Sequence, residues 1–143
     1  MVLAVLGLVS AMGVWGLLPA LEHEKVRSAA GIVMADLQYA QMVAARQREP
    51  VAVVFNESLR MYVIRQRGGG STIYRERFLG EDSEYDLDAM EVFTDGKKGT
   101  QVEIFPNGVA SKTVTVMVGI KDYRRSMSMS RTGRVRMLAP VAE

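Results

Sequence analysis

Residues 1–21 read MVLAVLGLVSAMGVWGLLPAL, and this stretch decides how the rest of the chain is arranged. It has no charged residue, and Ser10 is its only polar side chain. As an α-helix it would be about 30 Å long, which matches the hydrocarbon core of a bilayer. A helix that is apolar on every face has to be buried in lipid, in a large core or among copies of itself, and the rest of this chain is too short and polar to enclose it. The side chains expected to make these assembly contacts are Leu3, Leu6, Leu8, Val9, Met12, Trp15, Leu17 and Leu18.

Two other interpretations of this stretch concern targeting. A plain signal-anchor helix that holds a head domain at a membrane remains open. A cleaved secretory signal is disfavoured, because no basic residue precedes the apolar run and no A-x-A site follows it. Pro19 lacks the amide that would bond to the carbonyl of Trp15, so we expect a kink or a locally melted turn at that point.

Beyond residue 21 the helical pattern continues, but only one face stays apolar. Polar residues, among them Asp36 and Gln41, are expected on the other faces. The pattern ends at Glu49-Pro50, where the residue before proline disfavours helix, so we expect one helix of about 48 residues. The apolar positions follow a 4-3-4-3-4 spacing: Val26, Ala30, Val33, Leu37, Ala40 and Ala44. Of these, Val33, Leu37, Ala40 and Ala44 are predicted to pack against the rest of the chain.

The remainder of the chain predicts β-strands and turns with no further helix. Strands without intervening helices imply antiparallel sheets, one face of which lies on the apolar face of the helix. The predicted fold class is therefore α+β, with three parts: an apolar assembly half of the helix (1–24), an amphipathic half (25–49) and a β-rich head (50–143). The predicted strands are 51–55, 60–65, 72–77, 90–93, 101–105, 112–118, 126–130 and 134–138.

Composition gives no support for catalysis. The chain has no cysteine, which excludes disulfides and thiolate chemistry, and His23 is its only histidine. His23-Glu24 lacks the second histidine of H-E-x-x-H, because Arg27 stands at that position. Gly96-Lys97-Lys98-Gly99 is interpreted as a turn and not as a phosphate-binding loop. We expect no catalytic residue, cofactor site or metal site.

An acidic run at 81–91 is the one pattern that suggests a cation. Asp82, Glu84, Asp86 and Asp88 alternate along it, as the oxygen ligands of a calcium loop do. However, Leu87 occupies the position that needs glycine, and the twelfth position is not glutamate. A solvated acidic loop is the first interpretation, and a weak calcium site is the alternative.

Basic residues gather near the C-terminus. Residues 120–143 hold six basic and two acidic side chains, whereas the whole chain carries a net charge of +2. In a strand, Arg134 and Arg136 would share the solvent face while the intervening residue points to the other face. Arginines in this arrangement suit phosphate contacts, so DNA binding through Arg131, Arg134 and Arg136 is one hypothesis. The other is a charged face that prevents edge-to-edge pairing of the sheet.

Four blocks of sequence resemble a known family. The blocks are MVLAVLGL at 1–8, the helix end and first strand at 31–54, VEIFPNGVAS at 102–111 and TGRVR at 132–136. Together they resemble type IV pilin-like proteins of the GspH/FimT pseudopilin family over nearly the whole chain. The family's leader and first mature residues, including a glutamate at the fifth mature position, are absent from this sequence. Residues 66–100 do not match the family pattern.

The resemblance implies a precursor in the inner membrane that prepilin peptidase clips on the cytoplasmic side. The mature protein would then join copies of itself or other pilins in a periplasmic or cell-surface filament. This filament would be a type IV pilus or a type II secretion pseudopilus, in which the family usually supplies minor subunits. Some relatives of the FimT branch are linked to DNA uptake through the G-R-x-R strand, which is the basis for DNA as a second partner.

Three hypotheses about function follow. The first is a structural filament subunit assembled through its N-terminal helix, and the second is a DNA-binding minor pilin. A membrane-anchored enzyme is the third, and no motif in the sequence supports it.

Overall fold

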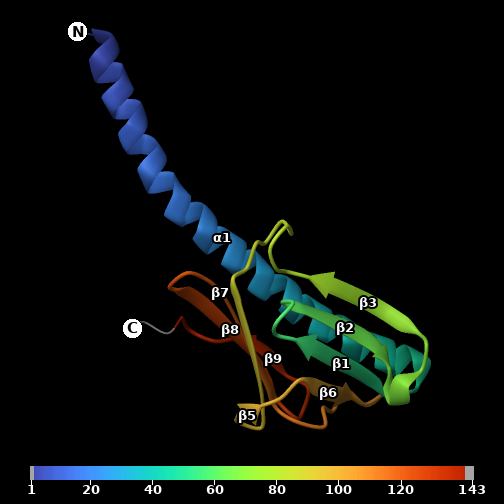
Figure 1. The fold of residues 1–143 in the computed structure, drawn as a ribbon. Coiled ribbons are helices and arrows are strands. Elements are labelled where there is room, and N and C mark those ends of the chain that lie inside the picture. Colours follow the sequence, from blue (N-terminus) through green and yellow to red (C-terminus); the bar gives the residue numbers. More distant parts are fainter. Residues whose placement is uncertain (1, 141–143) are drawn as a thin grey trace.

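The first element of the computed structural model is one long helix, α1 (Val2–Gln47, 46 residues). The structure describes the backbone of residues 2–140 and the side chains of residues 16–140. Figure 1 shows that the N-terminal part of α1 extends away from the head, whereas its C-terminal part lies along the strands. The helix runs without interruption through Pro19, so the melted turn expected there is absent. It ends where Arg48 adopts a left-handed conformation (φ 55°) two residues before Pro50.

The head consists of two antiparallel sheets, which we call sheet A and sheet B. Sheet A has the strand order β3-β2-β1-β6 and sheet B the order β5-β4-β7-β8-β9. Sheet A comprises β1 (Val51–Asn56), β2 (Met61–Gln66), β3 (Ile73–Phe78) and β6 (Gln101–Ile104). Sheet B comprises β4 (Ala89–Thr94), β5 (Lys97–Lys98), β7 (Val114–Ile120), β8 (Tyr123–Met129) and β9 (Val135–Met137). A short 3₁₀ turn (Arg67–Gly69) joins β2 to β3.

These elements confirm the α+β class and all eight predicted strands. Two differences from the prediction are local. The Gly96-Lys97-Lys98-Gly99 segment is not only a turn, because Lys97 and Lys98 form β5 and pair with Thr94 and Phe93. Strand β8 begins at Tyr123, three residues earlier than predicted, because Arg124 and Arg125 pair with Gly119 and Val118 of β7.

The core lies between the C-terminal half of α1 and the two sheets. Val33, Leu37, Ala40 and Ala44 are each at most 2% exposed. They pack in one cluster with alternate residues of the strands, such as Val53 of β1 and Val116 of β7. Among the helix residues with described side chains, Val26 is the first that is fully buried, whereas Leu21 is 56% exposed. The helix therefore becomes part of the head at about residue 26.

Candidate functional site

A buried carboxylate joins α1 to β2 and β3 of sheet A. Asp36 was expected on a polar face of the helix, but its side chain is only 1% exposed. Its Oδ2 accepts hydrogen bonds from the Tyr62 hydroxyl (2.6 Å) and from Arg77 Nε (3.0 Å). Its Oδ1 accepts bonds from Arg75 Nη1 (2.7 Å) and Arg77 Nη2 (3.3 Å). The Arg75 guanidinium also stacks 3.8 Å from the centroid of the Tyr39 ring.

These contacts keep Asp36 ionised. Burial alone would raise the pKa of Asp36, but hydrogen bonds from Arg77, Tyr62 and Arg75 outweigh burial and leave its pKa below the ordinary value. Burial, followed by the bond to Asp36, raises the pKa of the Tyr62 phenol. The cluster is thus an ion-paired, hydrogen-bonded unit. It connects one helix residue with β2 and β3.

A second polar contact holds two turns of the head against the helix. Gln41 Nε2 donates to the carbonyl of Gly133 (2.5 Å) and lies 3.5 Å from that of Gly108. Gly133 has φ +88°, and a Cβ there would lie 2.1 Å from the Gly108 oxygen. Both turns belong to the blocks that carry the family resemblance. Glycine is therefore required at 133 for backbone packing, whether or not the arginines that follow it bind a ligand.

The part of α1 that extends beyond the head exposes three large apolar side chains, which we call the stalk surface. Leu17, Leu18 and Leu21 are 59%, 58% and 56% exposed. No helix in the part of the chain with described side chains has the length and apolarity of a membrane span. The other predicted assembly residues have side chains outside the described residues: Leu3, Leu6, Leu8, Val9, Met12 and Trp15.

Polar contacts brace the helix where it leaves the head. Glu22 accepts a bond from Lys121 Nζ (2.5 Å), and the His23 ring stacks on Tyr123 with centroids 3.8 Å apart. Lys25 lies 3.9 Å from Asp86. The single histidine, on α1, is thus a surface stacking partner of Tyr123, the first residue of β8. These contacts orient the exposed part of α1 relative to the head.

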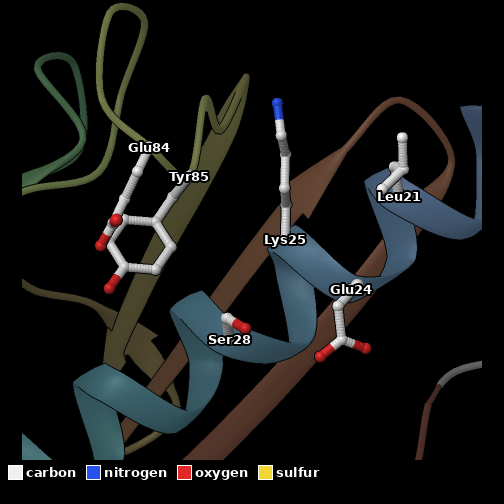
Figure 2. Close-up of a pocket in the computed structure, with 6 residues that line it drawn as sticks. All are labelled: Leu21, Glu24, Lys25, Ser28, Glu84 and Tyr85. Atoms are coloured by element: carbon white, nitrogen blue, oxygen red, sulfur yellow. The ribbon is translucent and has the colours of Figure 1, made fainter.

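An open gap of about 280 Å³ lies beside these contacts. In Figure 2 its helix side is formed by Leu21, Glu24, Lys25 and Ser28, and Glu84 and Tyr85 face them from the loop between β3 and β4. The gap is continuous with the exposed leucines, because Leu21 belongs to both. The gap therefore lies next to the apolar surface of the exposed leucines.

The arginines near the C-terminus differ from one another. Arg134 and Arg136 are exposed, whereas Val135 and Met137 pack against the core, which is the alternation expected for a strand. Arg131 donates to Asp95 (2.8 Å), and this bond holds the pKa of the Asp95 carboxyl below its ordinary value. The cross-strand pair Ser128–Arg136 places Arg136 on the same face of sheet B as the exposed Arg124. Arg134 and Arg136 therefore lie close together, while Arg131 is engaged by a carboxylate. Arg124 lies farther along β8, where it pairs with Gly119 at the stalk-side end of the head.

The acidic side chains at 81–88 do not converge on a common point. Glu81, Asp82, Glu84, Asp86 and Asp88 are all exposed. Among the described residues, no group of three or more His, Cys, Asp or Glu side chains is placed to hold a metal ion. The loop instead contacts the helix and the turn between β7 and β8, since Asp88 accepts a bond from the backbone amide of Lys121 (2.6 Å).

The fold is similar to that of two solved structures. One is the type IV minor pilin FimU of Pseudomonas aeruginosa, with a TM-score of 0.64 and 21% identity over 82% of this chain and 91% of that chain. The other is the minor pseudopilin EpsH from the type II secretion system of Vibrio cholerae, with a TM-score of 0.65 and 14% identity over 84% of this chain and 97% of that chain. The chain matches no protein-family model, and a search of curated proteins finds no match. The pilin-like fold expected from the resemblance is thus confirmed.

Asp36→Asn should lower the free energy of unfolding near neutral pH by about 2–3 kcal/mol, because two arginines lose their carboxylate. The folded-state pKa of Asp36 is depressed, so its contribution is complete above the unfolded-state pKa of about 4 and is lost as the pH falls through the folded-state pKa. The difference from wild type should therefore shrink in acid. Urea unfolding followed by circular dichroism at several pH values measures this difference, with the exposed Asp86→Asn as control. Equal effects of the two substitutions at neutral pH would contradict a stabilising cluster.

Gly133→Ala should destabilise the head more than Gly96→Ala does. Both glycines have a positive φ, at +88° and +79°, so both substitutions cost about 1–2 kcal/mol in backbone strain. Only at Gly133 does the new Cβ also meet a carbonyl oxygen, since nothing lies within 4 Å of a Cβ at Gly96. Thermal melts of the two variants give the comparison. If the melting temperature of Gly133→Ala is no lower than that of Gly96→Ala, the turns at Gly108 and Gly133 can move apart at little cost in free energy.

Proposed function

We propose that this protein is a subunit of a helical filament, assembled through the apolar half of α1. The observation that carries this proposal is the exposure of Leu17, Leu18 and Leu21 on a helix that has already left the head. Contiguous apolar surface of this kind marks an interaction site on a protein. Each buried side chain of this size contributes about 1.5–3 kcal/mol, so parallel stalks that cover one another gain a large driving force for assembly.

The class of filament is inferred from the fold and the sequence resemblance. The similar structures are a type IV minor pilin and a minor pseudopilin of a type II secretion system. We therefore place this chain in a type IV pilus or a type II secretion pseudopilus, as a minor subunit with copies of itself or other pilins as neighbours. The inferred role is structural, and the polar clusters of the head hold the fold together.

The stage before assembly is inferred from the sequence of residues 1–21. Their lack of charge suits an inner-membrane anchor, and the family resemblance implies a precursor that prepilin peptidase clips. The filament would then lie in the periplasm or at the cell surface. In this scheme the same apolar surface is covered first by lipid and then by neighbouring stalks.

DNA binding is the second candidate function, and a specific observation favours it. Arg134 and Arg136 are exposed, and neither guanidinium has a carboxylate within 4.0 Å among the described residues. Arginines of this kind are free to contact phosphates, and hydroxyl groups such as that of Ser128 lie beside Arg136. This role is compatible with a filament subunit, because the arginines lie on the head and the assembly surface lies on the stalk.

Deleting residues 1–24 should give a monomeric head that does not polymerise. The deletion removes the exposed leucines but keeps the helix residues that are described as buried against the head, which start at Val26. Electron microscopy of the full chain and of the truncated chain, with circular dichroism to verify folding, makes the comparison. Filaments formed by the truncated protein would contradict assembly through the stalk.

Replacing both arginines, Arg134→Ala and Arg136→Ala, should weaken binding to any DNA sequence alike. Each lost phosphate contact should reduce the slope of log K against log salt by about 0.9. Mobility-shift titrations at two salt concentrations measure both quantities, and Arg27→Ala at an exposed site on the helix is the control. Absence of wild-type binding at low salt, where the electrostatic contribution is largest, would exclude the DNA function.

A further inference from the structure

The face of sheet B that points away from the core carries a row of polar side chains. Met127 and Met129 of β8 pack in the core, so Ser128 between them lies on the opposite face, which we call the outer face of sheet B. The register extends this position across three strands, since Ser128 pairs with Thr115 of β7 and with Arg136 of β9. Figure 1 shows these strands side by side. Two hydroxyls and a guanidinium therefore stand next to one another across the sheet.

Three exposed arginines lie on this face or at its end. Arg136 belongs to the row, and Arg134 precedes it by two residues on the same side of the chain. Arg124 shares the face with Ser128 and lies four residues before it on β8, a separation of about 13 Å. Among the described residues, no carboxylate lies within 4.0 Å of any of the three arginines. Their charges are therefore available to an anion outside the chain.

The hydroxyls of Thr115 and Ser128 are also available. Both residues are only partly buried, and neither hydroxyl has a hydrogen-bond partner within the described residues. Ser130 and Thr132 differ from them, because their hydroxyls bond to each other at 2.8 Å. A free hydroxyl can donate to a phosphate oxygen, and a neighbouring guanidinium neutralises the charge of that phosphate.

The other charged and aromatic side chains of the outer face indicate which form of nucleic acid fits. On the strands of this face the one carboxylate is that of Glu91, which lies 3.5 Å from Lys98 Nζ. The same Nζ lies 4.8 Å from the centroid of the Phe93 ring, and Phe93 pairs with Thr115. The one aromatic ring of this face is thus covered by a cation. Single strands are bound by stacking their bases on open aromatic rings, whereas the backbone of a duplex requires only cations and hydrogen-bond donors.

We propose that the outer face of sheet B binds the phosphate backbone of double-stranded DNA. Arg124, Arg134 and Arg136 contact phosphates, and the hydroxyls of Thr115 and Ser128 donate to phosphate oxygens between them. The inference rests on the DNA function suggested above, to which it adds Arg124, the two hydroxyls and the duplex form of the ligand. The separation of about 13 Å between Arg124 and Ser128 corresponds to about four base pairs along a duplex. Backbone contacts carry no sequence information, so this binding is independent of sequence.

An added cation on the face tests the site without removing any contact. Thr115→Lys in the full chain should strengthen binding to a short duplex of mixed sequence and steepen the slope of log K against log salt by about 0.9. Ser71→Lys is the matched control, because it adds the same charge at an exposed position in the loop between β2 and β3 of sheet A. The control should bind with the slope of the wild-type protein. Mobility-shift titrations at several salt concentrations measure both variants.

Removal of the hydroxyls gives a different signature. Thr115→Val together with Ser128→Ala should weaken duplex binding about tenfold at every salt concentration, because two hydrogen bonds to phosphates are lost. The salt slope should stay the same, since a hydroxyl releases no counterion. Ser58→Ala together with Ser71→Ala removes two exposed hydroxyls from sheet A and should bind like wild type. Thermal melts verify that these variants remain folded.

Arg124→Ala should reduce the salt slope by about 0.9, whereas Arg27→Ala on the helix should leave it unchanged. If wild type binds the duplex but the variants at Thr115, Ser128 and Arg124 behave like their controls, this site is wrong and the DNA function rests on Arg134 and Arg136 alone. Tighter binding of either single strand than of the duplex would overturn the choice of ligand. Absence of wild-type binding at low salt would exclude the DNA function itself, and this site with it.

Discussion

The contact face of α1 is built largely from small side chains, and this allows two sheets to approach a single helix. Ala29, Ala30, Ala40 and Ala44 are fully buried, and strands of both sheets pack around them in one core. Larger residues on this face would hold the sheets away and open cavities beside the helix. Leu37 and three buried valines of α1 pack between these alanines. The second half of α1 is therefore the central element of the head.

Apolar packing does not account for all of the architecture. The edge strand β3 of sheet A carries Arg75 and Arg77 on the face turned toward the helix, and Asp36 supplies the negative charge that pairs with them. Inward-facing charges on an edge strand also discourage pairing with strands of other molecules. The same cluster thus attaches β2 and β3 to the helix and protects the edge at β3.

The sequence predicted the parts of the fold that depend on local periodicity. The 4-3-4 spacing from Val26 to Ala44 indicated the buried face of the helix, and the turn residues indicated the strand boundaries. It did not predict the partners of polar residues. Asp36 and Arg77 are 41 residues apart, and Gln41 and Gly133 are 92 apart, so no periodicity connects them. An aspartate on a helix is usually solvated, and only the paired arginines on β3 gave any sign of a buried partner.

The candidate site was predictable to a similar extent. Strand alternation indicated that Arg134 and Arg136 share an exposed face. The role of Arg131 depended on Asp95, which lies in a different hairpin 36 residues away. The pairing of Arg136 with Ser128 required the register of β9, which the sequence left uncertain upstream of Gly133. The excess of basic residues near the C-terminus thus indicated a basic surface, but only the tertiary structure shows which arginines belong to it.

The central claim is that the second half of α1 packs in the core of its own head, whereas the first half contacts other subunits. A disulfide-crosslinking scan of the full chain tests this claim most directly, because the chain has no cysteine of its own. The variants Leu17→Cys, Leu21→Cys and Ala40→Cys would be oxidised in the assembled state and separated by denaturing electrophoresis. The account predicts covalent dimers for the variants at 17 and 21 and none for Ala40→Cys, since Ala40 is buried within its own head. Dimers at position 40, with none at 17 and 21, would contradict it.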